Sequence, residues 1–187
     1  MPKSAILPKE RHDRDENPLW AELVQLVPVL SFALPFVARG SVDLSRAASG
    51  FLLGAGLAVG VSLLLVQQKH VLSPILVGAG LWLVAGALAF NVPLAPLAAW
   101  FVAAQASGLF VMALAVAVPA MLFSPHGYIG ARSADVSWLR RSSLLLLAAT
   151  VVTVVWAFWF RSNVRLGGGL PFIALNVTRR LLVRRAP

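Results

Sequence analysis

A carboxylate and a carboxamide stand one helical turn apart near the start of the first long apolar segment. Glu22 and Gln25 lie within residues 20–37, and Glu22 is the only carboxylate close to any apolar segment. Ionisable groups inside a membrane often mark proton or ion paths, so the pair predicts an intramembrane polar site. The alternative is a solvated carboxylate near the start of its helix, where the helix dipole favours negative charge.

A second amide, Gln105, lies near the middle of another apolar segment. A lone amide at the membrane midplane needs a partner, so we expect it to make an interhelical hydrogen bond. In a small channel or transporter subunit, Glu22, Gln25 and Gln105 would together line a path.

Acid–base chemistry has a candidate in the polar connection 124–141. This connection contains His126 and Asp135, and His70 lies in a turn that we expect on the same side. A histidine paired with a carboxylate could serve a membrane enzyme acting on lipid. Hydrogen bonding at the membrane interface is the alternative use of these histidines.

Other residues of chemical interest lack the spacing that a site needs. The polar tail contains residues of metal-ligand type, His12, Asp13, Asp15 and Glu16, but no spacing aims them at one ion. Residues 167–169 are glycines, but a Gly-Lys-Ser/Thr run does not follow them. The chain has no cysteine, which excludes disulfides and thiolate chemistry. We therefore predict a protein that is not an enzyme, with no catalytic, cofactor-binding or metal-binding residue.

The element that must position these groups is an uncharged run of 62 residues between Lys69 and Arg132. One straight helix of that length would measure about 93 Å, whereas the hydrocarbon core of a bilayer is about 30 Å thick. The run must therefore fold back, and the prolines within residues 91–96 predict where it does so. This pattern predicts a transmembrane hairpin with arms at about 71–90 and 97–123.

Composition and the remaining apolar segments predict an all-α integral membrane helical bundle. Hydrophobic residues make up 59% of the chain, charged residues 12%, and the mean hydropathy is +0.82. Segments 20–37, 47–66 and 142–160 add three spans to the hairpin, which gives five transmembrane helices within residues 19–160. Residues 1–18 form a polar tail, and residues 161–187 form a basic segment containing an amphipathic helix that we expect in the membrane interface.

Two sets of small residues predict close helix packing. The first set is two small-xxx-small pairs on the second span, Gly50 with Gly54 and Gly56 with Gly60. The second set repeats at four-residue spacing on the fourth span and consists of Ala99, Ala103 and Ser107. Small side chains on one helix face let another backbone approach closely.

Aromatic and basic residues predict contact with lipid head groups. The net charge is +9, but the basic residues stand between and after apolar segments, which favours anionic lipid over nucleic acid. The residues that we assign to this interface are Trp156, Trp159, Arg179, Arg180, Arg184 and Arg185. Five spans place the chain ends on opposite sides with eight Lys and Arg on each, so orientation follows only from the clustered arginines, which favour a cytoplasmic C-terminus.

Three stretches carry a resemblance to a known family. They are Glu22-Leu23-Val24-Gln25-Leu26-Val27-Pro28, Lys69-His70-Val71-Leu72-Ser73-Pro74 and Val136-Ser137-Trp138-Leu139-Arg140-Arg141. In order, they resemble the bacterial intracellular septation protein A family of small five-span inner-membrane proteins. The glycines of the second span and the Gly-rich C-terminal segment depart from that pattern. The resemblance implies a non-enzymatic role in envelope maintenance or division.

These observations favour a structural or accessory protein of the bacterial inner membrane. We expect it to work through helix packing and lipid contact, together with other membrane protein subunits. The two rival hypotheses are the channel or transporter subunit and the lipid-acting enzyme.

Overall fold

The computed structural model describes residues 19–39, 44–131, 135–161 and 163–185, and these ranges contain helices and no strand. In chain order the elements are α1 (Leu19–Arg39), α2 (Leu44–Gln67), α3 (Pro74–Asn91), α4 (Ala95–Ala104), α5 (Ser107–Phe123), α6 (Val136–Trp159), the π-helical turn η1 (Val164–Gly169) and α7 (Leu170–Arg184).

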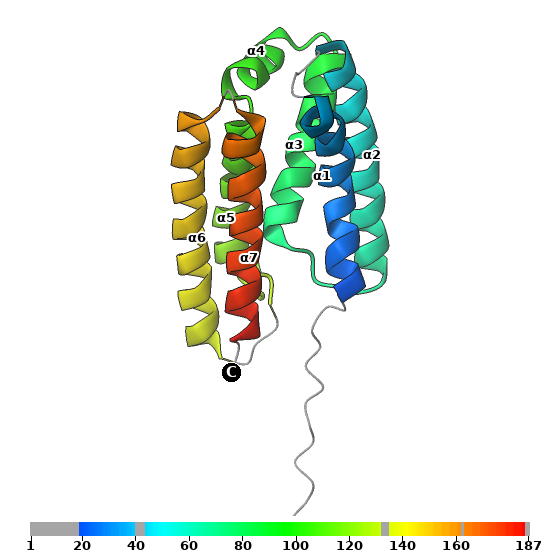
Figure 1. The fold of residues 1–187 in the computed structure, drawn as a ribbon. Coiled ribbons are helices and arrows are strands. Elements are labelled where there is room, and N and C mark those ends of the chain that lie inside the picture. Colours follow the sequence, from blue (N-terminus) through cyan, green and yellow to red (C-terminus); the bar gives the residue numbers. More distant parts are fainter. Residues whose placement is uncertain (1–18, 40–43, 132–134, 162, 186–187) are drawn as a thin grey trace, which may run out of the picture.

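The bundle consists of six long helices that alternate in direction, with α4 lying across one end (Figure 1). Helices α1, α2 and α3 lie on one side, and α5, α6 and α7 lie on the other. Helix α3 is central because it packs against both α2 and α5. We call the end near Leu19 and Arg184 the terminal end, and the end covered by α4 the opposite end.

Several of these helices are suited to a membrane. Three segments are long and apolar enough to cross it, Ala47–Gln67, Pro74–Asn91 and Val136–Trp159, and a fourth results if α4 and α5 count as one broken span. The apolar part of α1, Trp20–Ala33, is shorter than those three segments. The chain is therefore a membrane-type helical bundle, but the structure does not give the expected count of five spans.

The hairpin folds back where its prolines predict, since α3 ends at Asn91 and α4 begins at Ala95. The expected continuous arm at 97–123 is wrong, because α4 and α5 meet at an angle of 106°. Gln105 forms the break with a φ of 46°. The bend carries α4 across the opposite end and lets the buried Phe101 pack against Phe51 and Trp82.

The C-terminal helix is also placed differently from the expectation. Helix α7 does not lie apart from the bundle but packs antiparallel to α6 (Figure 1). Its residue Leu175 is fully buried. The turn between them starts at Asn163, whose side chain accepts hydrogen bonds from the backbone of Arg165 and Leu166. A Cβ at Gly167 would clash with the Phe160 carbonyl, so this tight turn requires glycine.

This arrangement brings the two described ends of the chain to the same end of the bundle (Figure 1). Five crossings would have placed Leu19 and Arg184 at opposite ends. The added antiparallel segment is α7, which we had expected in the membrane interface. Helix α6 is also longer than expected, because it begins at Val136 rather than at Ser142.

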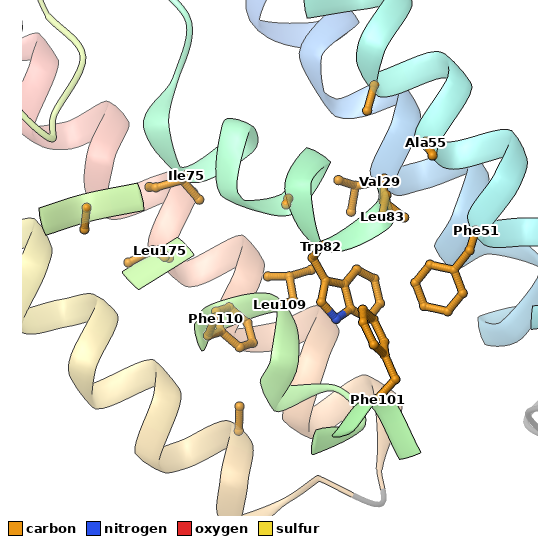
Figure 2. Close-up of a cluster of buried hydrophobic side chains, with 14 of the residues drawn as sticks. Val29, Phe51, Ala55, Ile75, Trp82, Leu83, Phe101, Leu109, Phe110 and Leu175 are labelled. Atoms are coloured by element: carbon orange, nitrogen blue, oxygen red, sulfur yellow. The ribbon is translucent and has the colours of Figure 1, made fainter. Parts of the chain in front are cut away.

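The core is built on an aromatic cluster and on glycines. Figure 2 shows Phe51, Trp82 and Phe101 grouped together, and the ring centroids of Phe51 and Trp82 lie 4.9 Å apart. A Cβ at Gly78 would lie 2.5 Å from Cα of Ala113, and one at Gly86 would overlap the Phe51 ring. The helices around α3 are therefore as close as glycine allows.

Candidate functional site

The terminal end contains a buried arginine that joins three parts of the chain. The Arg179 side chain donates from Nε to the Ile129 carbonyl at 2.9 Å, from Nη2 to the Gly130 carbonyl at 3.4 Å, and from Nη1 to Oε1 of Glu22 at 3.3 Å. Arg179 is only 5% exposed. Its neighbour Arg180 reaches the other carboxylate oxygen of Glu22, with Nε 3.2 Å from Oε2. The Glu22 carboxylate is thus held by two guanidinium groups from α7.

The carbonyls that bind Arg179 belong to a buried loop, residues 124–131. Tyr128 and Ile129 are fully buried, and the Tyr128 hydroxyl lies 2.9 Å from Oγ1 of Thr150 in α6. Gly127 and Gly130 have φ values of +59° and +63°, a conformation that L side chains rarely adopt. The two glycines thus let the loop fold tightly under the bundle, with its carbonyls available to α7. Burial raises the pKa of the Tyr128 phenol to about 12, although the hydrogen bond to Thr150 acts in the other direction.

Gln25 links α1 to the start of α3. Its Oε1 accepts a hydrogen bond of 2.9 Å from the backbone N–H of Ser73, the N-cap residue of α3, and its Nε2 donates to the Ala21 carbonyl. Gln25 is buried. Both polar groups of the predicted intramembrane pair therefore make interhelical contacts at the terminal end.

Gln105 does not join that pair. It lies between α4 and α5, which meet at the opposite end (Figure 1). Its side chain is exposed. The expected position at the midplane is corrected, because the helix breaks at this residue. The structure therefore does not bring Glu22, Gln25 and Gln105 together along one path.

The small residues predicted for helix packing differ in burial, and only some of them lie between helices. On α2, Gly54 is buried against the Leu83 side chain of α3 and Gly50 is half-buried, whereas Gly56 and Gly60 are exposed and a Cβ at either would meet no atom within 4 Å. Ala99 and Ala103 are exposed on α4, whereas Ser107 is buried on α5, so the bend separates the predicted face. Between packed helices, the closest approaches are made at Gly78 and Gly86, which the small-residue spacing did not indicate.

The residues predicted for the lipid interface also differ in burial. Trp156 and Trp159 are exposed at the end of α6, and the Trp156 indole N–H donates to the Leu166 carbonyl at 3.0 Å. Arg184 and Arg185 are exposed. Arg179 is not available to lipid because it is buried on Glu22 and the loop, and Arg180 is half-buried beside it.

Asp135, which the sequence offered as a candidate for acid–base chemistry, caps the start of α6. Its Oδ1 accepts from the backbone N–H groups of Ser137 at 2.8 Å and Trp138 at 3.0 Å, which caps α6. The hydrogen bond from Trp138 is the main cause that lowers the Asp135 pKa, and Ser137 adds to it. Within the described ranges, no three His, Asp or Glu side chains are grouped so that they could hold a metal ion. The tail residues His12, Asp13, Asp15 and Glu16 lie outside those ranges.

An open cavity of about 340 Å³ lies at the terminal end, between the turn that joins α2 to α3 and the loop 124–131. Its polar lining includes Lys69, His70, Ser124 and His126, and its apolar lining includes Val66, Val71, Leu72 and Pro74. The sequence placed both histidines on the same side, but it did not indicate that they would share a cavity.

No protein-family model, curated protein or solved structure matches this chain. Its function therefore has to be inferred from the fold and from the contacts at the terminal end.

Proposed function

We propose that this chain is a non-enzymatic, multi-pass protein of the bacterial inner membrane that serves as a structural or accessory subunit of a larger membrane complex. One observation carries the proposal. The polar side chains best suited to chemistry, Glu22, Gln25 and Arg179, are engaged in contacts that hold helices together. Engaged in this way, these side chains hold the helices together, whereas a general acid or base must lie within hydrogen-bond reach of its substrate.

The exterior supports the same proposal. Large apolar side chains are exposed along α2 and α6, among them Leu52, Leu63, Leu145 and Val152. Such a surface is suited to lipid tails or to the apolar faces of other membrane subunits. The resemblance to the septation protein family fits this class of role, with envelope maintenance or division as the process.

The distribution of basic residues supports an orientation for the protein. Of the 16 Lys and Arg, twelve belong to segments attached by sequence to the terminal end, and only Arg39, Arg46, Arg161 and Arg165 belong to the opposite end. The positive-inside rule then favours a cytoplasmic terminal end. With five spans, the same residues were divided equally between the two sides. The antiparallel packing of α7 moves the four arginines within residues 179–185 to the terminal end, and this makes the distribution unequal.

Affinity purification in a mild detergent, with cross-linking before extraction, tests the accessory role. We expect the chain to co-purify with a defined set of membrane proteins at fixed stoichiometry. Recovery of the chain alone from cross-linked membranes would contradict the proposal. Ion or solute flux through proteoliposomes containing only the purified chain would support the channel or transporter hypothesis instead.

A further inference from the structure

Helix α4 lies across the bundle, whereas the long helices run along it. The angle between α4 and α5 is 106°, and α4 covers the opposite end of the bundle (Figure 1). Helices α3 and α6 are long and apolar enough to cross a membrane. When they do so, α4 lies near the plane of one membrane surface.

No side of α4 is suited to water. Residues 92–104 contain no charged, hydroxyl or amide side chain. Ala99 and Ala103 are exposed, and Val102 is 55% exposed. A helix that lies on a membrane surface normally has a polar face for water, but α4 has none. A helix that is apolar all round has to be covered by an apolar medium or by protein.

The surroundings of α4 favour lipid as this covering. Of its ten residues only Phe101 is buried, so the helix is open except where it faces the bundle. Acyl chains can cover such a helix over its whole exposed surface, whereas a protein partner packs on one face. Trp156 and Trp159 are exposed where α6 ends, at the same end of the bundle, and tryptophan is enriched at the level of lipid head groups.

The backbone of α4 is also suited to an apolar medium, in which polar backbone groups need partners. The two prolines within residues 92–96 have no N–H that could remain unpaired at the start of the helix. At its end, Nη1 of Arg161 donates to the Ala103 carbonyl at 3.5 Å, and the Ser107 hydroxyl donates to the Ala104 carbonyl at 2.6 Å. Arg161 is exposed, so its guanidinium group can also reach a lipid phosphate beside α4.

We propose that α4 is embedded in the lipid leaflet at the opposite end of the bundle, just below the head groups. Acyl chains cover Ala99, Val102 and Ala103, and Arg161 contacts phosphates beside the end of the helix. The break at Gln105 then marks the depth at which the chain stops crossing the membrane and lies in its plane. The inference rests on the proposed membrane location but not on the proposed accessory role.

Spin labels on single cysteines test the inference in proteoliposomes that contain only the purified full chain. The chain has no cysteine of its own, and Ala99→Cys and Ala103→Cys are small changes at exposed positions of α4. Collisions of each label with oxygen, which dissolves in lipid, and with a water-soluble nickel chelate give its depth. We expect both labels about 5–10 Å inside the boundary between head groups and acyl chains, the depth of interfacial helices.

Two further single variants are the matched references. Ala148→Cys is exposed near the middle of α6 and should lie in the hydrocarbon core, whereas Arg165→Cys is exposed in the turn after α6 and should meet the chelate. Labels on α4 that meet the chelate as often as Arg165→Cys would overturn the inference and leave the membrane location intact. If Ala148→Cys also meets the chelate, the membrane location fails with it. Labels on α4 shielded from both reagents would indicate a second copy of the chain and likewise overturn the inference.

A measurement on the unaltered protein covers the case in which a label disturbs α4. A phospholipid with its photoactivatable group next to the head group should cross-link to the peptide that contains residues 92–104, and also to peptides from α2 and α6. Cross-links to α2 and α6 without any to residues 92–104 would overturn the inference. Because every measurement uses the isolated chain, its outcome does not depend on a partner complex.

Discussion

Nη1 of Arg179 lies 3.3 Å from Oε1 of Glu22, a contact that joins the last helix to the first across 157 positions of sequence. The same guanidinium group binds two carbonyls of the 124–131 loop. One side chain therefore ties α1, α7 and the connection between α5 and α6. It also fixes both described ends of the chain at the terminal end of the bundle.

Substitution of Arg179 should strongly destabilise the protein. Arg179→Met leaves the carbonyls of Ile129 and Gly130 without their buried donor and removes one of two cations from Glu22. Removing one partner of a buried ion pair typically costs about 3–5 kcal/mol. We expect a loss near the lower end of that range, because Arg180 still contacts Glu22. Equilibrium unfolding in mixed detergent micelles measures it.

The matched control for Arg179 is Arg180→Gln, whose side chain is 40% exposed and contacts the same carboxylate. An exposed ion pair contributes up to about 1 kcal/mol, so this variant should unfold close to the parent protein. A double variant of Arg179→Met with Glu22→Gln should lose less stability than the sum of the single variants, because the two residues interact. Equal effects of Arg179→Met and Arg180→Gln would disprove the role assigned to Arg179.

Substitution by alanine should change the stability in opposite directions at Gly78, where α3 and α5 approach closely, and at Gly56, where no neighbour is close. Gly78→Ala places a Cβ 2.5 Å from Cα of Ala113, a backbone atom that cannot rotate away, so the helices must separate. Such overpacking typically costs about 1–3 kcal/mol. Gly56→Ala meets no atom within 4 Å and should gain up to about 1 kcal/mol from helix propensity. Thermal unfolding of the two variants checks this, and a similar shift in both would contradict the packing.

Tyr128 offers an optical test of the buried loop because it is the only tyrosine in the chain. Its pKa is raised from near 10 to about 12, mainly by burial, so the folded protein should show phenolate absorbance only near pH 12. A raised pKa contributes stability that is fully present below pH 10 and is lost as the pH rises from 10 towards 12. A titration midpoint near 10 in the folded protein would show that the loop is exposed.

The Tyr128→Phe variant is the control for this titration. It should abolish the absorbance change and cost about 1 kcal/mol through loss of the hydrogen bond to Thr150. Thr150 keeps its bond to the Leu146 carbonyl, so no hydroxyl is left without a partner.

The sequence predicted the parts of the fold that depend on local chemistry. The prolines within residues 91–96 interrupt helical hydrogen bonding wherever they stand, so the turn between α3 and α4 was predictable. The apolar segments likewise indicated helices α2, α3 and α6. The break at Gln105 was not predictable in this way, because it contains neither proline nor glycine and depends on where Phe101 packs.

The role of α7 depends on contacts between distant residues. Its arginines have the pattern of an interfacial helix, and only the loop carbonyls and Glu22 make burial of Arg179 favourable. One signal was present, since the buried residues Pro171, Leu175 and Arg179 recur every four positions on one helix face. The sequence singled out Glu22 and Gln25 as a possible intramembrane polar site, but the residues that they contact, Arg179 and Ser73, could not be identified from spacing alone.

The central claim is that the two described ends of the chain, at Leu19 and Arg184, lie on one side of the membrane. The measurement that tests it most directly is topology mapping with reporters fused to Met1 and to Pro187, together with impermeant thiol labelling of Arg165→Cys at the opposite end. The chain has no cysteine of its own, so the label has no background. Both reporters should indicate the cytoplasm, and Arg165→Cys should be labelled from outside. Reporters in opposite compartments would contradict the antiparallel placement of α7 and with it the contact between Glu22 and Arg179.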